Sequence, residues 1–478
     1  MLGVILQRDL VVKHKMRFAV ILGVLFVCIH SVNAGIKGRI DAIVKKNSKL
    51  DFSICVREAK TGRSIYQYRS QQPMIPASNM KIITSAAALH ILGADYQFIT
   101  RVGLSGDTLV VIGSGDPLLG DRESYDLNGH EDSTFLHDIA VKLGEIGVES
   151  INSIVVDSTV FEDQRAHPHW SPDDLNKDWA CEVCGINYRG NCIDMTVSNR
   201  RGRISVLVDP PTSYVAIQNK VSSIRSGSGA VGAYRIAGRP NVLDVTGKCK
   251  TKQGPFEVAI EKPALYFGYR LAEYLGQQGI SVNGKLLEKR YVDSENWRSL
   301  TEYRTPLAHC LYRCNKNSFN LAAESLLKTV SAYAQDGPGA GSWQHGSTAV
   351  SDYLRGLGIN SGEFVIDDGS GLSRENRLSA NTIVTVLHAV YHSPDWDFYK
   401  ESLAVGGVDG TIGKDFKGQA YQGKFLGKTG YINRVRGFSG ICYAEHNTYI
   451  FSILANNANY IRDVVNSIAK SIIDAETD

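Results

Sequence analysis

Ser78 and Lys81 are the pair with the clearest capacity for chemistry in this sequence of 478 residues. They lie three positions apart, so in a helix they share one face, and the lysine amine can reach the serine oxygen and accept its proton. Pro76 just before them suits the start of a helix, where the first N–H groups lack partners within the helix. The spacing therefore predicts a nucleophile with its base, which is the minimum that acyl transfer needs.

The same Ser-x-x-Lys spacing recurs at 325–328 and 467–470, so the surrounding residues must discriminate between the three copies. Apolar residues at helical spacing around the two later copies predict that their serine and lysine lie on a solvated face. The segment after Ser78 is apolar nearly all round, which predicts a helix buried inside a domain. Burial disfavours the ammonium form and lowers the pKa of Lys81, so that a neutral amine can act as the base.

The order of local patterns predicts a catalytic domain built from both ends of the chain. Alternating residues at 52–69 predict two strands around a turn, and further strand patterns begin at Gly423. Between residues 96 and 290, short alternating runs separated by glycine and proline predict a β-rich insertion, either undivided or in two parts that join near Met195. We therefore expect an α+β fold, with mixed helices on an antiparallel sheet formed by residues 35–95 and 291–478.

Residues 1–34 have the features of an export signal. Basic residues precede twelve apolar residues at 18–29, and small residues at 32–34 suit cleavage. A bilayer span needs about 20 apolar residues, so we expect a cleaved signal peptide and no membrane span after cleavage, with an uncleaved anchor as the alternative. Removal of this segment reduces 52 Lys and Arg to 48 and 49 Asp and Glu to 48. This balanced charge gives no indication of binding to nucleic acid or to an anionic membrane.

Eight cysteines follow the signal, and an even number in an exported chain favours disulfides. They are Cys55, Cys181, Cys184, Cys192, Cys249, Cys310, Cys314 and Cys442. His167 and His169, upstream of Cys181 and Cys184, would also suit zinc. We nevertheless expect no metal and no other cofactor, because oxidation is the commoner fate of cysteines in exported proteins.

Two later motifs supply what the serine and lysine lack. In Ser318-Phe319-Asn320 the hydroxyl can relay protons and the amide can orient Lys81, although a simple helix cap is the alternative. In Lys428-Thr429-Gly430, within a strand pattern, the lysine and the hydroxyl suit a substrate carboxylate, and the glycine leaves room for a substrate backbone. A similar triplet at 60–62 is better explained as a hairpin turn.

The order Ser-x-x-Lys, Ser-x-Asn, Lys-Thr-Gly resembles that of penicillin-binding proteins and serine β-lactamases. The chain is more specifically similar to bacterial D-alanyl-D-alanine carboxypeptidases of the penicillin-binding protein 4 type. The matching features are Pro76 to Lys81, Asn315 to Glu324, Asp368 to Arg374, Lys428 to Gly430, Gly115 to Pro117, and the 240-residue gap between Ser78 and Ser318. Phe319 departs from the pattern, since related enzymes frequently have an aspartate there.

This resemblance implies a β-lactamase/transpeptidase-like catalytic domain in a periplasmic serine DD-peptidase. Such an enzyme cleaves the terminal D-Ala-D-Ala bond of peptidoglycan stem peptides, and in some cases D-Ala-diaminopimelate cross-links, through an acyl-enzyme on Ser78. β-Lactams would bind covalently to the same serine. The implied catalytic residues are Ser78, Lys81, Ser318, Asn320 and Lys428, and the implied substrate-binding residues are Lys428, Thr429, Gly430 and Tyr431.

Two other functions fit the same motifs. A serine β-lactamase or esterase would need a second base for rapid deacylation, and no glutamate motif between Ser318 and Lys428 indicates one. A catalytically silent cell-wall binding protein could retain the fold without the reaction.

Overall fold

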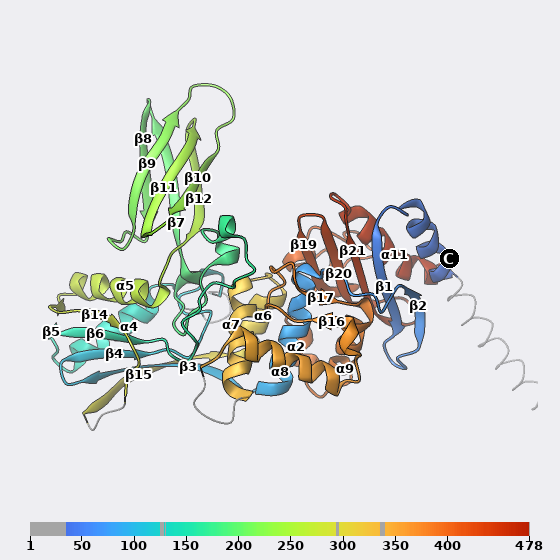
Figure 1. Cartoon of the computed structure of the whole chain (residues 1–478), viewed down its shortest axis with the longest axis horizontal. Coiled ribbons are helices and arrows are strands. Elements are labelled where there is room, and N and C mark those ends of the chain that lie inside the picture. Colours follow the sequence, from blue (N-terminus) through green and yellow to red (C-terminus); the bar gives the residue numbers. More distant parts are fainter. Residues whose placement is uncertain (1–34, 125–128, 130, 293–295, 335–339, 478) are drawn as a thin grey trace, which may run out of the picture.

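The computed structural model describes residues 35–124, 129, 131–292, 296–334 and 340–477. The expected signal peptide lies outside this part of the chain. Figure 1 shows the two termini of the described chain at one end of the molecule, and the segments of the insertion at the other. Every helix among the described residues is too short or too polar to cross a lipid bilayer.

A six-stranded sheet joins the N-terminal and C-terminal parts of the chain, which confirms the predicted assembly from both ends. Neighbouring strands are antiparallel. In spatial order they are β18 (Ala404–Val405), β19 (Phe425–Ile432), β20 (Val435–Tyr443), β21 (Thr448–Asn456), β1 (Asp51–Glu58) and β2 (Ser64–Tyr68). The 60–62 triplet forms the turn between β1 and β2, as predicted.

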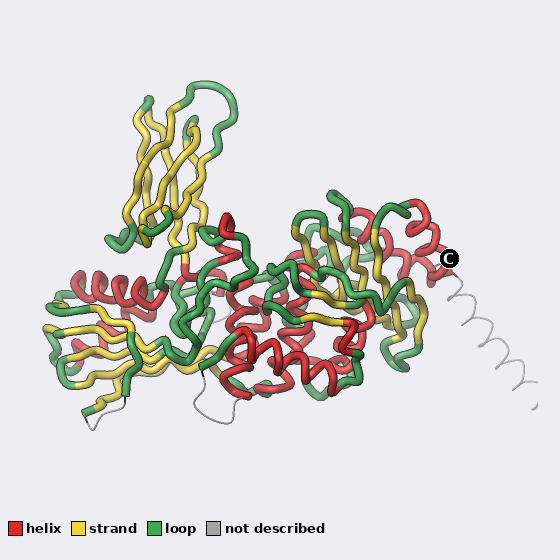
Figure 2. Tube along the Cα trace, viewed as in Figure 1, coloured by secondary structure: helices red, strands yellow, loops and turns green. Residues whose placement is uncertain are grey.

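Helices cover both faces of this sheet (Figure 2), so its central strands are buried along nearly their whole length. On one face, α11 (Arg462–Thr477) and the helical residues 35–46 share a core with the sheet. The other face packs on a larger helical core. The helices of this second layer are α2 (Met80–Leu92), α6 (Leu307–Asn315), α7 (Asn320–Ala334), α8 (Trp343–Gly356), α9 (Ala380–Tyr391) and the short α10 (Trp396–Lys400).

Helix α2 is the centre of the helical layer. Eleven of its 13 residues are buried, which confirms the helix predicted to be buried on all sides. Its alanines at 86–88 are completely or almost completely buried, and they leave room for close neighbours because they add little volume. The helix packs against α7 and α9, and its N-terminus follows the one-turn helix η1 (Ala77–Asn79).

The insertion contains a second mixed layer and two small sheets, which stand away from it in Figure 1. The mixed layer has a sheet in the order β14 (Leu286–Glu288), β6 (Ser153–Asp157), β4 (Thr108–Ile112), β3 (Gln97–Ser105) and β15 (Trp297–Pro306), packed with α4 (Thr134–Glu145) and α5 (Pro263–Gln277). One small sheet has the order β12 (Lys252–Ala259), β7 (Cys192–Arg200) and β8 (Arg203–Asp209). The other has the order β10 (Val231–Ile236), β11 (Arg239–Cys249) and β9 (Ala216–Ser223). Two short pairs are β13 (Ser281–Val282) with β5 (Ser150–Ile151), and β16 (Phe364–Val365) with β17 (Arg377–Leu378).

These strands suggest boundaries slightly different from those expected. Because β15 pairs with β3, we place the end of the insertion at Pro306 instead of residue 290. We also place the start of the small sheets at Cys192, since β7 runs continuously through Met195.

The eight cysteines of the described chain are all buried and carry free thiols, so the expectation of disulfides is wrong. Five of them lie in the helical core, two in the core of the insertion, and Cys442 in the core beneath α11. They pack there as small apolar side chains, a common role for unpaired cysteine.

The prediction for the motif at Ser325 and Lys328 is also wrong, because both side chains are fully buried. The Lys328 ammonium lies 3.7 Å from the centre of the Trp343 ring and donates a hydrogen bond to the Gln164 carbonyl at 2.6 Å. The insertion therefore covers a face of α7 that helical periodicity assigned to solvent. At the third copy, Ser467 is exposed and Lys470 is half-buried, in agreement with the prediction.

We expect Lys328→Ala to lower the free energy of unfolding by about 3 kcal/mol, since it leaves a cavity and removes the partner of Glu162. The matched variant Lys470→Ala, in the half-buried copy, should cost less than about 1 kcal/mol. Urea unfolding monitored by tryptophan fluorescence measures both values. Equal losses would show that the burial of Lys328 does not stabilise the chain.

Candidate active site

Ser78 lies in the turn that precedes α2, and its side chain is half-buried, so a substrate can reach the hydroxyl. The residue before it, Ala77, has φ of +47°, in the left-handed region that alanine rarely adopts. Tight packing holds this conformation, since a Cβ at Gly371 would lie 1.9 Å from the Ala77 carbonyl oxygen. The turn that carries the serine is therefore fixed by close backbone contact.

The Lys81 amine is the centre of the site. Its Nζ lies 3.2 Å from Ser78 Oγ, 2.7 Å from Asn320 Oδ1 and 3.0 Å from the Ser370 carbonyl oxygen. The side chain is completely buried, and burial lowers the pKa of Lys81 to about 8. A neutral amine has two N–H donors and one lone pair. If the donors serve Asn320 and Ser370, the lone pair faces the serine hydroxyl.

Asn320 connects this amine to the insertion. Its Nδ2 donates a hydrogen bond to the Trp179 carbonyl at 2.7 Å, so Oδ1 must face Lys81. Phe319, the departure from the family pattern, packs beneath the Arg313 guanidinium, whose Cζ lies 4.7 Å from the centre of the Phe319 ring. The side chain at position 319 therefore supports Arg313 in the wall beside Ser318 and Asn320.

Lys428 and Ser318 form a second hydrogen-bonded pair. Lys428 lies on β19, is completely buried, and donates to Ser318 Oγ and to the Thr429 carbonyl, both at 2.9 Å. The Ser318 hydroxyl thus has a partner within the site, beyond the role of a simple helix cap. Burial, followed by the neighbouring charge of Lys81, holds the pKa of Lys428 well below its usual range. Thr429 donates to the Thr411 hydroxyl at 3.1 Å, and the Tyr431 side chain is exposed.

Gly430 has a reason for its identity that sequence reasoning missed. A Cβ at this position would lie 2.7 Å from the Pro76 carbonyl oxygen and 3.0 Å from the Ser78 nitrogen. The missing side chain therefore makes room for the turn that carries Ser78, whereas the sequence suggested room for a substrate backbone. β19 can lie directly against the backbone of Ser78 because position 430 is glycine.

Two further residues, Glu324 and Asp368, hold the turn whose Ser370 carbonyl accepts from Lys81. Glu324 accepts hydrogen bonds from the Gly369 and Ser370 N–H groups at 3.0 and 2.8 Å, and from Trp343 Nε1 at 2.7 Å. Asp368 accepts from the Gly371 N–H at 2.7 Å, so the turn presents the Ser370 carbonyl to the amine. A sequence signal existed, since Glu324 lies one helical turn after Asn320.

The carboxyl of Glu324 has an unusual environment. Burial and then the nearby Asp368 raise its pKa to about 7. Both of its oxygens accept hydrogen bonds, so neither is free to act on a substrate.

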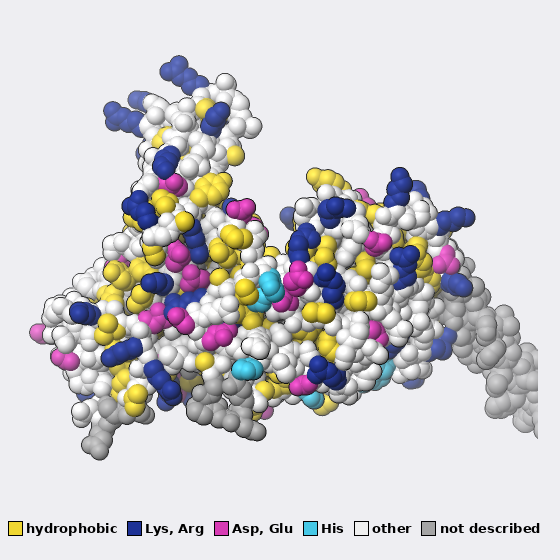
Figure 3. Space-filling model, in the orientation of Figure 1, with side chains coloured by type: hydrophobic (Ala, Val, Ile, Leu, Met, Phe, Trp, Pro, Cys, Tyr) yellow, Lys and Arg dark blue, Asp and Glu magenta, His cyan; other side chains and the backbone are white. Residues whose placement is uncertain are grey.

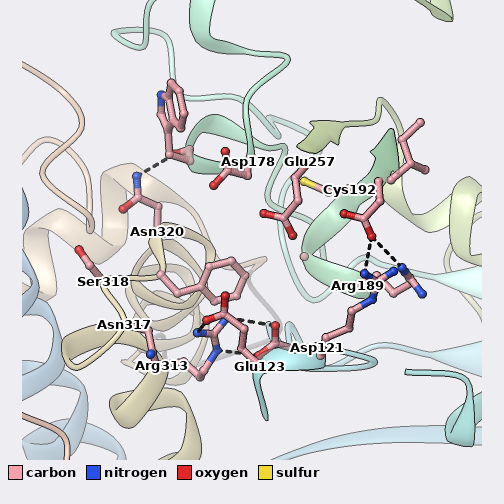
Figure 4. Close-up of a pocket in the computed structure, with 16 residues that line it drawn as sticks. Asp121, Glu123, Asp178, Arg189, Cys192, Glu257, Arg313, Asn317, Ser318 and Asn320 are labelled. Carbon is pink, nitrogen blue, oxygen red and sulfur yellow. Dashed lines mark hydrogen bonds and ion pairs between the residues drawn. The ribbon is translucent and has the colours of Figure 1, made fainter. Parts of the chain in front are cut away.

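A pocket continues from Ser318 and Asn320 towards the insertion (Figure 4). Its charged lining residues are Asp121, Arg122, Glu123, Asp178, Arg189, Asp194, Glu257 and Arg313. The arginines are paired, because Arg313 binds Asp121 and Glu123 while Arg122 and Arg189 bind Asp194.

Asp178 and Glu257 are the acids of this pocket that form no ion pair within the described chain, and Figure 4 shows both carboxyl groups facing the pocket. Burial raises the pKa of both, and for Glu257 the charge of Asp178 adds to the effect and the pKa reaches about 7. The pocket, which Ser318 and Asn320 also line, therefore favours a cationic group.

Comparison with known proteins identifies the family. Residues 36–476 match the D-Ala-D-Ala carboxypeptidase 3 (S13) family. The chain belongs to this family. The family resemblance recognised from the motifs is thereby confirmed.

Known proteins are similar to this chain in sequence or in fold over most of their length. A D-alanyl-D-alanine carboxypeptidase of Actinomadura sp. (strain R39) is 28% identical over 429 residues, which cover 84% of this chain and 77% of that protein. The crystal structure of penicillin-binding protein 4 from Haemophilus influenzae matches with a TM-score of 0.77 and 21% identity, over 91% of this chain and 98% of the other. The same protein in complex with a novel β-lactam matches with a TM-score of 0.71 and 22% identity, over 90% and 98% of the two chains. The predicted fold class is confirmed.

We expect Asn320→Asp to shift the pH dependence of penicillin acylation. In the native chain the rate should rise with pH and level off near 8, because only the neutral amine can accept a proton. A carboxylate beside Nζ would favour the ammonium form of Lys81. It would therefore move this rising limb of the pH profile to higher pH by about 1 unit or more. Stopped-flow acylation between pH 6 and 10 measures the shift. Asn317→Asp, an exposed change of the same charge, should leave the limb in place, and an unmoved limb in both variants would exclude Lys81 as the titrating base.

Proposed function

We propose that this chain is a serine DD-peptidase that removes the terminal D-Ala from peptidoglycan stem peptides by two-step acyl transfer. The observation that carries the proposal is the buried Lys81 amine, which meets Ser78 Oγ at 3.2 Å where three distant motifs converge. Membership of the S13 family supports the same substrate class.

In the first step, neutral Lys81 takes the proton of Ser78 Oγ, and the oxygen attacks the carbonyl carbon of the penultimate D-Ala. The N–H groups of Ser78 and Tyr431 stabilise the oxyanion, and loss of one such donor typically costs about 100- to 1000-fold in rate. The packing of β19 against the serine turn supports this pairing, since Gly430 brings the two backbones together.

The tetrahedral intermediate then collapses. The C–N bond breaks, and the leaving amine of D-Ala takes up the proton that Lys81 received, relayed through the Ser318 hydroxyl. Ser318 suits this role because its hydroxyl accepts a hydrogen bond from Lys428 and the residue lines the pocket. Water, deprotonated by Lys81, next attacks the ester carbonyl. The C–O bond to Ser78 breaks, Lys81 returns the proton to Ser78 Oγ, and the shortened peptide leaves as a carboxylate.

Lys428 and Thr429 bind the terminal carboxylate of the peptide. In the free site, burial and Lys81 together disfavour the ammonium form of Lys428. An incoming carboxylate restores that charge, and a charged Lys428 disfavours the ammonium form of Lys81. β-Lactams carry a comparable carbonyl and carboxylate, so they should acylate Ser78 in the same way.

The rival function of rapid β-lactam hydrolysis needs a dedicated base for the second step. Glu324 is the buried glutamate closest in sequence to Asn320, and its hydrogen bonds to backbone and tryptophan occupy it. We therefore propose a long-lived β-lactam adduct. Turnover of nitrocefin at many cycles per second would favour the β-lactamase instead.

The acidic pocket supports a preference within this substrate class. We propose that Asp178 and Glu257 bind the free amine of a diamino acid in the stem peptide, since two unpaired carboxyl groups favour a cation. Cleavage of D-Ala-diaminopimelate cross-links would use the same pocket. The proposed place of action is the periplasm, where peptidoglycan is exposed to an exported enzyme.

We expect Ser78→Ala to abolish both covalent labelling by penicillin and release of D-Ala from a synthetic peptide that ends in D-Ala-D-Ala. Ser467→Ala, which changes the exposed serine of the copy at 467–470, should retain both. Gel fluorography and a D-alanine assay measure the two outcomes. If Ser78→Ala still bound penicillin covalently, the assigned nucleophile would be wrong. If the native chain bound penicillin and peptide but released no D-Ala, the silent cell-wall binding function would be favoured.

We expect Glu257→Gln and Asp178→Asn to raise KM about 10-fold for peptides with a free side-chain amine, with little change in kcat, because they weaken binding without touching the reacting atoms. The same peptides with the amine acetylated serve as the matched control and should show no difference between variants and native chain. Equal KM changes on both peptides would contradict a cation-binding pocket.

A further inference from the structure

His167, His169 and Asp367 bring three potential ligand atoms together at the junction of the insertion and the catalytic domain, all within 4.8 Å of one another. On the face shown in Figure 3, histidine and acidic side chains adjoin at this junction. The cysteines that the sequence offered as possible zinc ligands are not part of the group. Cys181 and Cys184 lie buried in two separate hydrophobic cores.

The distances in this group suit a small metal ion. The Asp367 Oδ2 atom lies 2.9 Å from His169 Nδ1 and 3.8 Å from His167 Nδ1. Ligand bonds of about 2.0–2.2 Å in a tetrahedral zinc site place neighbouring ligand atoms about 3.3 Å apart. The observed separations lie on either side of that value, so small side-chain rotations would bring all three atoms into a coordination shell.

The surroundings hold two of the three side chains in place. His167 is almost fully buried. The centre of its ring lies 5.2 Å from the ring centre of Trp343 and 6.0 Å from that of Trp170. Asp367 accepts a hydrogen bond from the Ser373 hydroxyl, while its backbone N–H donates to Asn376 Oδ1 at 2.8 Å. Fixed outer contacts of this kind orient ligands in metal sites.

His169 supplies the open side of the group, since 52% of its side chain is exposed. An ion can enter from solvent there, and a water molecule can complete the coordination. The backbone N–H of His169 donates to His167 Nδ1 at 3.3 Å, the long end of the hydrogen-bond range. A metal bond at His167 Nδ1 would therefore replace a weak contact.

We infer that His167, His169 and Asp367 bind a divalent transition-metal ion such as Zn²⁺, and that the ion fastens the insertion to the catalytic domain. This inference reverses the expectation of a chain without metal. Two imidazoles with one carboxylate suit Zn²⁺ or Co²⁺, whereas Ca²⁺ and Mg²⁺ prefer oxygen ligands.

The position of the ion gives it a consequence for the neighbouring site. Asp367 is followed directly by Asp368, which accepts hydrogen bonds from Trp170 Nε1 at 2.9 Å and from the Gly371 N–H. Ser370, three residues after Asp367, provides a carbonyl acceptor for Lys81. The ion would therefore brace the turn that positions the amine, without contacting any reacting atom.

The test is Zn²⁺ binding to the full chain after chelator treatment and dialysis, measured by isothermal titration calorimetry. We expect one Zn²⁺ per chain and a melting temperature that rises by a few degrees with Zn²⁺ but not with Ca²⁺ or Mg²⁺. His169→Gln should weaken binding by about 100-fold. This residue is exposed, so the variant should fold, and a native circular dichroism spectrum checks that it does. His137→Ala removes another exposed histidine and should bind as the native chain does.

Visible absorption of the Co²⁺-loaded chain provides a second measurement that does not depend on activity. Bands of a Co²⁺ site with nitrogen ligands should appear in the native chain and in His137→Ala, and should be lost in His169→Gln. Equal Zn²⁺ affinity in all three proteins, or binding of Ca²⁺ as tight as that of Zn²⁺, would overturn the site. Because the readout is binding and not peptide cleavage, the result is independent of the proposed function.

Discussion

The structure depends on keeping the amine of Lys81 out of water with only neutral oxygens around it. Within the described chain its contacts are a hydroxyl, an amide and a backbone carbonyl. Burial of an ammonium ion without an opposite charge carries a large cost in free energy, whereas burial of a neutral amine carries a much smaller one. The fold thus favours the neutral amine by withholding a carboxylate partner, and this requires a helix that is covered on every side.

Three segments distant in sequence must meet to cover it, and the sheet explains how they can. Its strands come from both ends of the chain, so the turn before α2 lies beside β19. Backbone contact at Gly371 and Gly430 closes the remaining gaps, since a Cβ at either position would collide with the turn at 76–78. Glycine is needed here for close approach, and the position of Ser78 follows from it.

The sequence predicted those features that short-range patterns control. The burial of α2, the hairpin at 60–62, the shared sheet and the three motifs all follow from spacing and composition within a few residues. The exposure of Lys328 was mispredicted, because residues near Gln164 cover it from more than 160 positions away. The roles of Glu324 and Ser370 were missed for a related reason, since their hydrogen bonds join α7 to a turn that no periodicity connects to it.

The contact between Asn320 and Trp179 gives the insertion a part in orienting the amide that faces Lys81. An amide can rotate by half a turn at little cost, which would present its NH2 group to Lys81 in place of its oxygen. The carbonyl of Trp179 prevents this exchange, and Trp179 belongs to the insertion. A shortened chain that kept only the sheet and its helices would retain Ser78, Lys81 and Asn320, and yet it would lose the carbonyl that orients the Asn320 amide. The insertion therefore helps to determine which donors and acceptors surround the Lys81 amine.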